Sequence, residues 1–274
     1  MRDIDTGTED LLARVEDGVG VLTMNRPERR NALSGAMLAA LGRTLATFEV
    51  DDEVGCVLVT GAGGAFCAGG DVKAMAGGPD DSTGRRVGLD ERIHLQRLDQ
   101  RAVSGRLFEM PKPTVAALPG PAAGAGLSIA LACDLRYAAE RAVLTTAFAR
   151  VGFAGDYGGT WFLTRLVGPA RARELYFLSA RISAEEARAD GLVNAVFPDD
   201  RLDEEALAIA KRLAAGPRVA YRYMKENLNR AVFGELGECL DMEAAHHIRT
   251  GLTEDHREAV AAFNEKREPS FKGR

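Results

Sequence analysis

The spacing of apolar residues changes several times along the first 200 residues. Residues 11–27 consist of two apolar runs around Asp17-Gly18, a dipeptide typical of tight turns, and this pattern predicts a β-hairpin. Ser34 is followed by apolar residues at helical spacing through Phe48, which predicts a helix that Ser34 caps. Short apolar runs predict further strands at residues 56–60, 114–118, 135–138 and 143–145.

Helical periodicity dominates the second half of the chain. A long helix is predicted from about residue 90 to 110, where Pro111 and Pro113 stop it, and an apolar helix is predicted at residues 127–134. After Asp156 the sequence predicts helices at residues 158–166, 170–178, 184–189, 203–215, 219–231, 236–251 and 254–266. We therefore expect an α/β core over residues 1–200. The helical region over residues 201–274 is the predicted oligomerisation element, because its helices have little left to cover within one subunit.

Composition and charge exclude several classes of protein. The 274 residues are 46% apolar and 27% charged, and the net charge of -5 argues against nucleic-acid binding. The most apolar stretch, residues 122–133, is too short to span a bilayer, and residues 1–10 lack the apolar segment of a signal peptide. Four scattered cysteines suit reduced thiols in a cytoplasmic protein. No metal site is expected, since the adjacent His246 and His247 would diverge on a helix.

Two glycine-rich loops follow predicted strands, at residues 61–71 and 119–126. Neither has the glycine spacing of a dinucleotide-binding loop, and Ser128 lies outside the GxSxG pattern of serine hydrolases. Small residues before a helix leave backbone N–H groups free, so two such loops facing each other could bind an oxyanion. Tight turns and close packing are the alternative explanation of the same glycines.

Asp156 is a single carboxylate within "FARVGFAGDYGGTW", residues 148–161, a run of small and apolar residues. Gly-Asp-Tyr-Gly-Gly is typical of a turn, so Asp156 could cap the helix that follows. A carboxylate in apolar surroundings could also act as a base with a raised pKa. The local sequence leaves both interpretations open.

Five motifs occur in order along the chain. They are "NRPERRNAL" (25–33), "AFCAGGDVKAM" (65–75), "PGPAAGAGLSIALACDLRYAAE" (119–140), "GGTWFLTRLVG" (158–168) and "ISAEEARADGLVNAVFP" (182–198). With these motifs the chain resembles the enoyl-CoA hydratase/isomerase family, the crotonases, from about residue 11 to near the C-terminus. The resemblance implies a spiral of ββα units, a helical trimerisation region and trimers that often pair into hexamers. It also implies an acyl-CoA thioester substrate, with CoA as part of the substrate and no separate cofactor.

The resemblance also implies roles for single residues. The N–H groups that stabilise the thioester enolate fall on Ala68 and Ala125, one in each glycine-rich loop. Ser128 and Phe148 are expected to line the acyl pocket. The residues that match the family's CoA contacts are Arg29, Arg30 and Lys73, with Phe263 and Lys266 from another subunit.

The chain departs from the hydratases at two positions where they carry glutamates. Ser128 and Phe148 match those positions, and neither can manage the proton of an attacking water as a carboxylate does. Asp156 falls where some isomerases of the family carry a working aspartate. A related dehalogenase has a nucleophilic aspartate there, but it also needs a histidine that no motif here supplies. The sequence therefore favours enoyl-CoA isomerisation, with non-standard hydration or acyl-CoA binding without much catalysis as alternatives.

Overall fold

The computed structural model describes residues 1–71 and 87–274. Its main sheet contains strands that run antiparallel from β1 to β3 and parallel from β3 onward. In spatial order these strands are β1 (Arg2–Ile4), β2 (Leu11–Glu16), β3 (Val19–Met24), β4 (Cys56–Gly61), β5 (Thr114–Leu118), β7 (Leu135–Ala139) and β10 (Ala195–Phe197). A small second sheet contains β6 (Ala122–Ala123), β8 (Val143–Thr145) and β9 (Ile182–Ser183).

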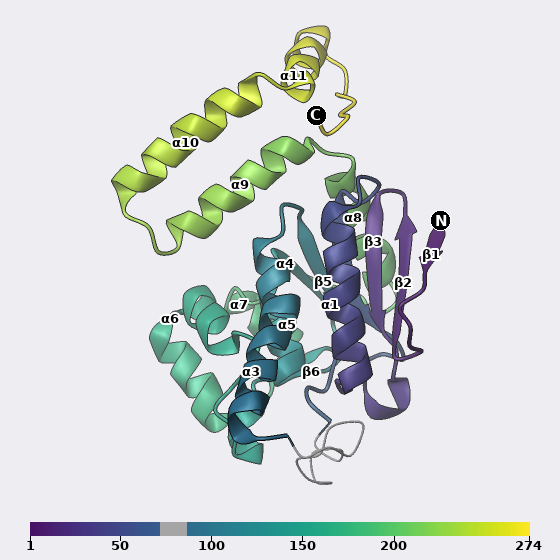
Figure 1. Cartoon of the computed structure of the whole chain (residues 1–274), viewed down its shortest axis with the longest axis vertical. Coiled ribbons are helices and arrows are strands. Elements are labelled where there is room, and N and C mark those ends of the chain that lie inside the picture. The colour runs from purple at the N-terminus through teal and green to yellow at the C-terminus, as the bar shows by residue number, and fades with distance from the viewer. Residues whose placement is uncertain (72–86) are drawn as a thin grey trace.

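Helices surround the main sheet and continue beyond it (Figure 1). The helices of the first 200 residues are α1 (Gly35–Val50), α3 (Leu89–Gln100), α4 (Arg106–Glu109), α5 (Ala125–Ala132), α6 (Gly159–Leu178) and α7 (Ala184–Ala189). Those that follow are α8 (Leu202–Ala214), α9 (Arg218–Ala231), α10 (Leu236–Gly251) and α11 (Glu254–Glu265). A π-helical turn, Arg101–Gly105, joins α3 to α4, and 3-10 turns occur at Pro27–Arg29 and Phe148–Val151.

Local sequence signals account for several of these elements. Asp17 and Gly18 have φ values of 49° and 80°, the left-handed pair that a tight hairpin turn requires, and they join β2 to β3 as predicted. The hydroxyl oxygen of Ser34 accepts a hydrogen bond from the Met37 N–H, which confirms the predicted cap of α1. Pro169 interrupts α6, so the two helices predicted there form one kinked helix.

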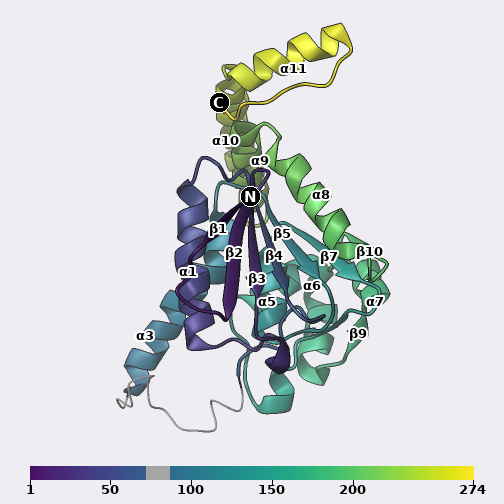
Figure 2. The same cartoon turned by 90° about the vertical axis from the view of Figure 1, so that its right-hand side faces the viewer.

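Two apolar layers hold the core together. One lies between the sheet and the helices α1, α5 and α6, and contains fully buried side chains such as Phe48 and Phe66. The other lies between the opposite face of the sheet and α8, which contributes Leu202, Ala206, Ala210 and Ala214. Figure 2 shows α1 and α8 on opposite sides of the strands. Helix α8 therefore belongs to the core layers, although the sequence prediction placed it in the region 201–274.

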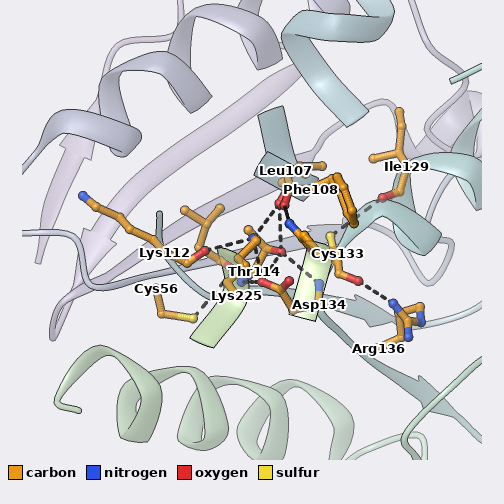
Figure 3. Close-up of polar contacts among 12 residues, drawn as sticks. Cys56, Leu107, Phe108, Lys112, Thr114, Ile129, Cys133, Asp134, Arg136 and Lys225 are labelled. Carbon is orange, nitrogen blue, oxygen red and sulfur yellow. Dashed lines mark hydrogen bonds and ion pairs between the residues drawn. The ribbon is translucent and has the colours of Figure 1, made fainter. Parts of the chain in front are cut away.

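The last three helices extend away from the sheet, as both views show. Helix α9 is nevertheless anchored to the core by Lys225, whose side chain is only 8% exposed. Its Nζ lies 2.8 Å from Asp134 Oδ2 and donates a hydrogen bond to the carbonyl oxygen of Leu107 (Figure 3). Asp134 Oδ2 also accepts hydrogen bonds from the N–H and the hydroxyl of Thr114. The overall architecture confirms the predicted α/β core followed by a helical C-terminal region.

Candidate active site

The two glycine-rich loops meet backbone to backbone. Ala123 donates its N–H to the Cys67 carbonyl oxygen at 2.9 Å, which links the loop after β4 to β6. A Cβ at Gly69 would lie 2.9 Å from the Ala123 carbonyl oxygen and 3.5 Å from the Ala125 nitrogen. Gly69 also has a φ of 90°, so both its conformation and its surroundings require glycine. The loop after β4 therefore lies directly against the beginning of α5.

The first turn of α5 presents unused backbone donors. The helix starts at Ala125 without a side-chain cap, and its first internal hydrogen bond runs from the Ser128 N–H to the Gly124 carbonyl. The N–H of Ala125 consequently has no partner among the described residues, and the positive end of the helix dipole lies beside it. This matches the role expected of Ala125.

The expectation for Ala68 is wrong, because its N–H is already used within the protein. It donates to the Arg30 carbonyl oxygen at 2.9 Å and ties the loop to the 3-10 turn at Pro27–Arg29. Two residues further along, the N–H of Gly70 has no hydrogen-bond partner in the described part of the chain. Gly70 directly follows the glycine that approaches Ala125, so it replaces Ala68 as the candidate donor of this loop.

Asp156 lies in a strained turn and does not cap a helix. Its neighbours Gly155 and Tyr157 have φ values of 115° and 49°. Helix α6 begins at Gly159 behind Gly158, and no side chain caps it. Asp156 Oδ1 is buried and has no hydrogen-bond partner among the described residues. The lack of any side-chain cap on α6 excludes the capped-turn interpretation. Burial raises the pKa of the Asp156 carboxyl to about 6.

Aromatic and hydroxyl side chains surround the turn of Asp156. A Cβ at Gly159 would overlap the Ser128 hydroxyl oxygen and lie 2.6 Å from the Tyr176 hydroxyl oxygen, so α5 and α6 meet here. The Phe148 ring stacks on Tyr176 with a centroid distance of 5.8 Å and also lies next to Gly124. Burial raises the pKa values of Cys67, Tyr157 and Tyr176, and the negative charge of Asp156 adds a smaller contribution to each, so all three lie near it.

The predicted acyl-pocket residues are thus brought together, whereas the predicted CoA contacts are not. Ser128 and Phe148 are buried beside the two loops. Arg29 and Arg30 are exposed, and only the backbone of Arg30 is tied to the site. Lys73 lies outside the described residues. Phe263 is 84% exposed and, like Lys266, lies at the end of α11, far from α5 and α6 in the same chain (Figures 1 and 2).

Sequence reasoning missed two groups at this site. Gly70 stands in the same motif as Ala68, and only the three-dimensional partner of each N–H distinguishes them. Tyr176 lies in the last turn of α6, where a tyrosine at helical spacing is indistinguishable from ordinary packing. Its unpaired buried hydroxyl becomes visible only in the folded chain.

Comparison with known proteins decides the family. The sequence model described as "Enoyl-CoA hydratase/isomerase" matches residues 14–274. The chain belongs to this family. The match covers nearly the whole chain, so it includes both the core and the C-terminal helices.

The names of similar proteins in the enoyl-CoA hydratase/isomerase family describe several different activities. The 1,2-epoxyphenylacetyl-CoA isomerase of Escherichia coli K12 is 39% identical over 97% of this chain and 99% of its own. The probable enoyl-CoA hydratase of Rhodobacter capsulatus is 37% identical over 95% and 96%. The 4-chlorobenzoyl coenzyme A dehalogenase-1 of an Arthrobacter species is 33% identical over 91% and 88%.

Solved structures of the family have the same fold. The enoyl-CoA hydratase of Bacillus anthracis is 34% identical and superposes with a TM-score of 0.88 over 97% of this chain and 100% of its own. That of Mycobacterium smegmatis is 31% identical with a TM-score of 0.86 over 96% and 99%. The predicted crotonase fold is therefore confirmed.

Two further findings concern the described residues as a whole. No group of three or more His, Cys, Asp or Glu side chains in residues 1–71 and 87–274 is arranged to hold a metal ion. No helix in the same part of the chain is long and apolar enough to cross a membrane.

Proposed function

We propose that this protein isomerises the double bond of an enoyl-CoA thioester, with Asp156 as the base that removes a proton from one carbon and returns it to another. The observation that carries the proposal is the partly buried carboxyl of Asp156 beside the junction of the two loops, whose Oδ1 atom is buried and has no partner among the described residues. A carboxyl with a pKa near 6 holds a proton more firmly than an ordinary aspartate. It can therefore remove a proton near neutral pH and also give it back.

The thioester oxygen is proposed to bind between the N–H groups of Gly70 and Ala125. Removing a proton next to the thioester carbonyl makes an enolate, whose charge accumulates on that oxygen. Two backbone donors aimed at this oxygen stabilise the enolate more than the neutral thioester, and one such donor contributes about 3–4 kcal/mol in a dry site. The dipole of α5 acts in the same direction.

Hydration is disfavoured by the other side chains at the site. Ser128 and Phe148 offer a hydroxyl and an aromatic ring, so neither can accept a proton as a carboxylate would. Ser128 moreover donates its hydroxyl to the Gly124 carbonyl oxygen at 3.2 Å. An isomerase among the relatives, the one that acts on 1,2-epoxyphenylacetyl-CoA, adds support, although hydratases and a dehalogenase are also similar.

The test is to incubate the protein with cis-3-, trans-3- and trans-2-enoyl-CoA and to follow the products by absorbance and mass. We expect interconversion of the 3-enoyl and 2-enoyl esters and slow or absent hydration of crotonyl-CoA. Asp156→Asn should lower turnover at least about 10²-fold with little change in CoA-ester affinity. Asp99→Asn is the matched control, because burial raises the pKa of this second aspartate also.

Each other outcome would identify one of the alternatives. Rapid hydration of crotonyl-CoA by both the wild type and Asp156→Asn would show that another group activates water. Tight binding of all three esters with no change in any of them would indicate an acyl-CoA-binding protein with little catalysis. Loss of turnover in Asp99→Asn with full turnover in Asp156→Asn would assign the base to α3.

A further inference from the structure

Tyr176 has a buried hydroxyl that the proposed proton transfer does not use. The hydroxyl oxygen has no hydrogen-bond partner among the described residues. Leaving a buried donor unpaired is costly in folding, so such groups in native proteins usually have a function or a bound partner. Tyr176 lies in the second half of α6, a kinked helix that packs against α5. The kink brings the residue close to the first turn of the same helix.

Close contacts fix the position of this hydroxyl. A Cβ at Gly159 would lie 2.6 Å from the hydroxyl oxygen, and a Cβ at Gly155 would lie 3.3 Å from it. These glycines lie on either side of the segment that begins with Asp156. The stacked Phe148 ring, at an interplanar angle of 12°, holds the phenol ring from the other direction. The hydroxyl therefore lies against the turn that carries the base, where the absence of two side chains gives it room.

The chemical state of the hydroxyl makes it a donor. Burial, with a further contribution from the charge of Asp156, raises the pKa of Tyr176, so the phenol stays protonated at any working pH. Asp156 Oδ1 and the Tyr157 hydroxyl are likewise buried and unpaired. Three unpaired polar atoms around one turn are a poor match for an acyl chain made only of carbon and hydrogen.

We propose that Tyr176 is a specificity-determining residue whose hydroxyl donates a hydrogen bond to an oxygen on the acyl group. The substrate class is then an acyl-CoA with an oxygen substituent at C4, the far carbon of the migrating double bond, or at the carbon after it. Asp156 must reach C2 and C4 to move the double bond, and Tyr176 contacts the same turn, so the oxygen belongs on C4 or C5. This inference rests on the proposed function for the direction in which the acyl chain lies.

The test measures binding and needs no turnover, so it can fail independently of the isomerase proposal. Hexanoyl-CoA, 4-oxohexanoyl-CoA and 5-oxohexanoyl-CoA are titrated into the full-length protein by calorimetry. A ketone oxygen only accepts hydrogen bonds, so it reports a donor on the protein. We expect one ketone to bind at least about 10-fold more tightly than hexanoyl-CoA to the wild type.

Tyr176→Phe keeps the ring and its stacking on Phe148 and removes only the donor. In this variant the dissociation constant of hexanoyl-CoA divided by that of the preferred ketone ester should fall to about 1. Tyr137→Phe is the matched control, because its ring packs against Phe197 on the other face of the sheet, and it should keep the wild-type ratio. Circular dichroism and the melting temperature establish that each variant is folded.

Three results would overturn the proposal. The first is a wild type that binds all three esters equally, which also decides the case should Tyr176→Phe not fold. The second is a preference that Tyr176→Phe retains in full, which would assign the donor to another group. The third is the same retained preference in Tyr176→Phe together with a raised pKa of Asp156 in the pH dependence of turnover. That result would show that the hydroxyl stabilises the ionised Asp156 and not an oxygen of the substrate.

Discussion

Asp156 determines the pH dependence expected of this protein. Burial raises its pKa to about 6, and only the ionised form can remove a proton. We therefore expect kcat/KM for isomerisation to rise about 10-fold per pH unit below pH 6 and to level off above it. Initial rates between pH 4.5 and 8.5, with stability checked at each pH, measure this profile. A rate that stays constant between pH 5 and 7 would contradict the assignment.

The raised pKa of Asp156 also predicts that Asp156→Asn gains stability while it loses activity. Because the folded state prefers the protonated carboxyl, ionisation costs stability as the pH rises from about 3.8 to about 6. Asp156→Asn removes this cost, so the variant should be more stable than the wild type above pH 6 and no more stable below pH 4. Solvent reaches part of the group, so we expect a gain of about 1–2 kcal/mol at pH 8.

Urea unfolding of both proteins at pH 4 and pH 8 measures the difference. A variant that is less stable than the wild type at pH 8 would mean that the Asp156 carboxylate has a stabilising partner in the folded protein.

At the scale of elements, the loop after β4 and the first turn of α5 can be tested donor by donor. Replacing a single amide by an ester removes one N–H and leaves every side chain in place. An ester at Gly70 or Ala125 should lower kcat about 10²-fold, the usual effect of losing one oxyanion donor. An ester at Ala68 is the matched control: it removes the bond to the Arg30 carbonyl oxygen and should lower stability more than turnover. Equal losses of kcat at all three positions would contradict the assignment of Gly70.

A second prediction concerns the anchor of α9. Lys225 and Asp134 form an ion pair in which the lysine is nearly buried and the aspartate partly exposed, and Asp134 also accepts two hydrogen bonds from Thr114 (Figure 3). Lys225→Met leaves the carboxylate without its cation, so the free energy of unfolding should fall by about 2–4 kcal/mol. The double variant with Asp134→Asn should recover part of this loss. Denaturant unfolding that shows no loss in Lys225→Met would mean that α9 is held by apolar packing alone.

The sequence predicts elements well where the signal is local. The hairpin at Asp17-Gly18 and the cap at Ser34 depend on residues within a few positions of each other. The short strands β1, β6, β9 and β10 have two or three residues each, too few to show an alternating pattern, and the sequence did not predict them. The partner of the Ala68 N–H lies 38 residues away at Arg30, so only the fold reveals it. Long-range hydrogen bonds and burial are therefore where prediction of the site failed.

At the scale of the whole molecule, helices α9, α10 and α11 and their connections expose large apolar side chains, which we call the C-terminal apolar surface. Its members are Met224, Leu228, Val232, Phe233, Leu236, Leu240, Ile248, Leu252, Val260 and Phe263. Exposed apolar residues that gather in one region are typical of contacts with other chains. The predicted trimer, or dimer of trimers, would cover these residues and could bring Phe263 and Lys266 to the CoA moiety of a neighbouring site.

Analytical ultracentrifugation tests the assembly directly. We expect a trimer or hexamer for the wild type. Leu228→Asp combined with Leu240→Asp places charges on this surface and should give smaller species. If Phe263 contacts CoA across subunits, the double variant should also raise KM for the CoA ester more than it lowers kcat. A wild-type protein that sediments as a monomer at micromolar concentration would contradict the predicted assembly.

The most direct test of the account is exchange of deuterium from solvent into the acyl group. In D2O, a base that moves a proton between C2 and C4 also exchanges it with solvent, so wild-type protein should place deuterium at the α or γ carbon of 3-enoyl-CoA. Asp156→Asn binds the same ester without the base and should place none there on the same time scale, as followed by mass and NMR. Equal incorporation by both proteins would contradict the account, because another group would then carry the proton.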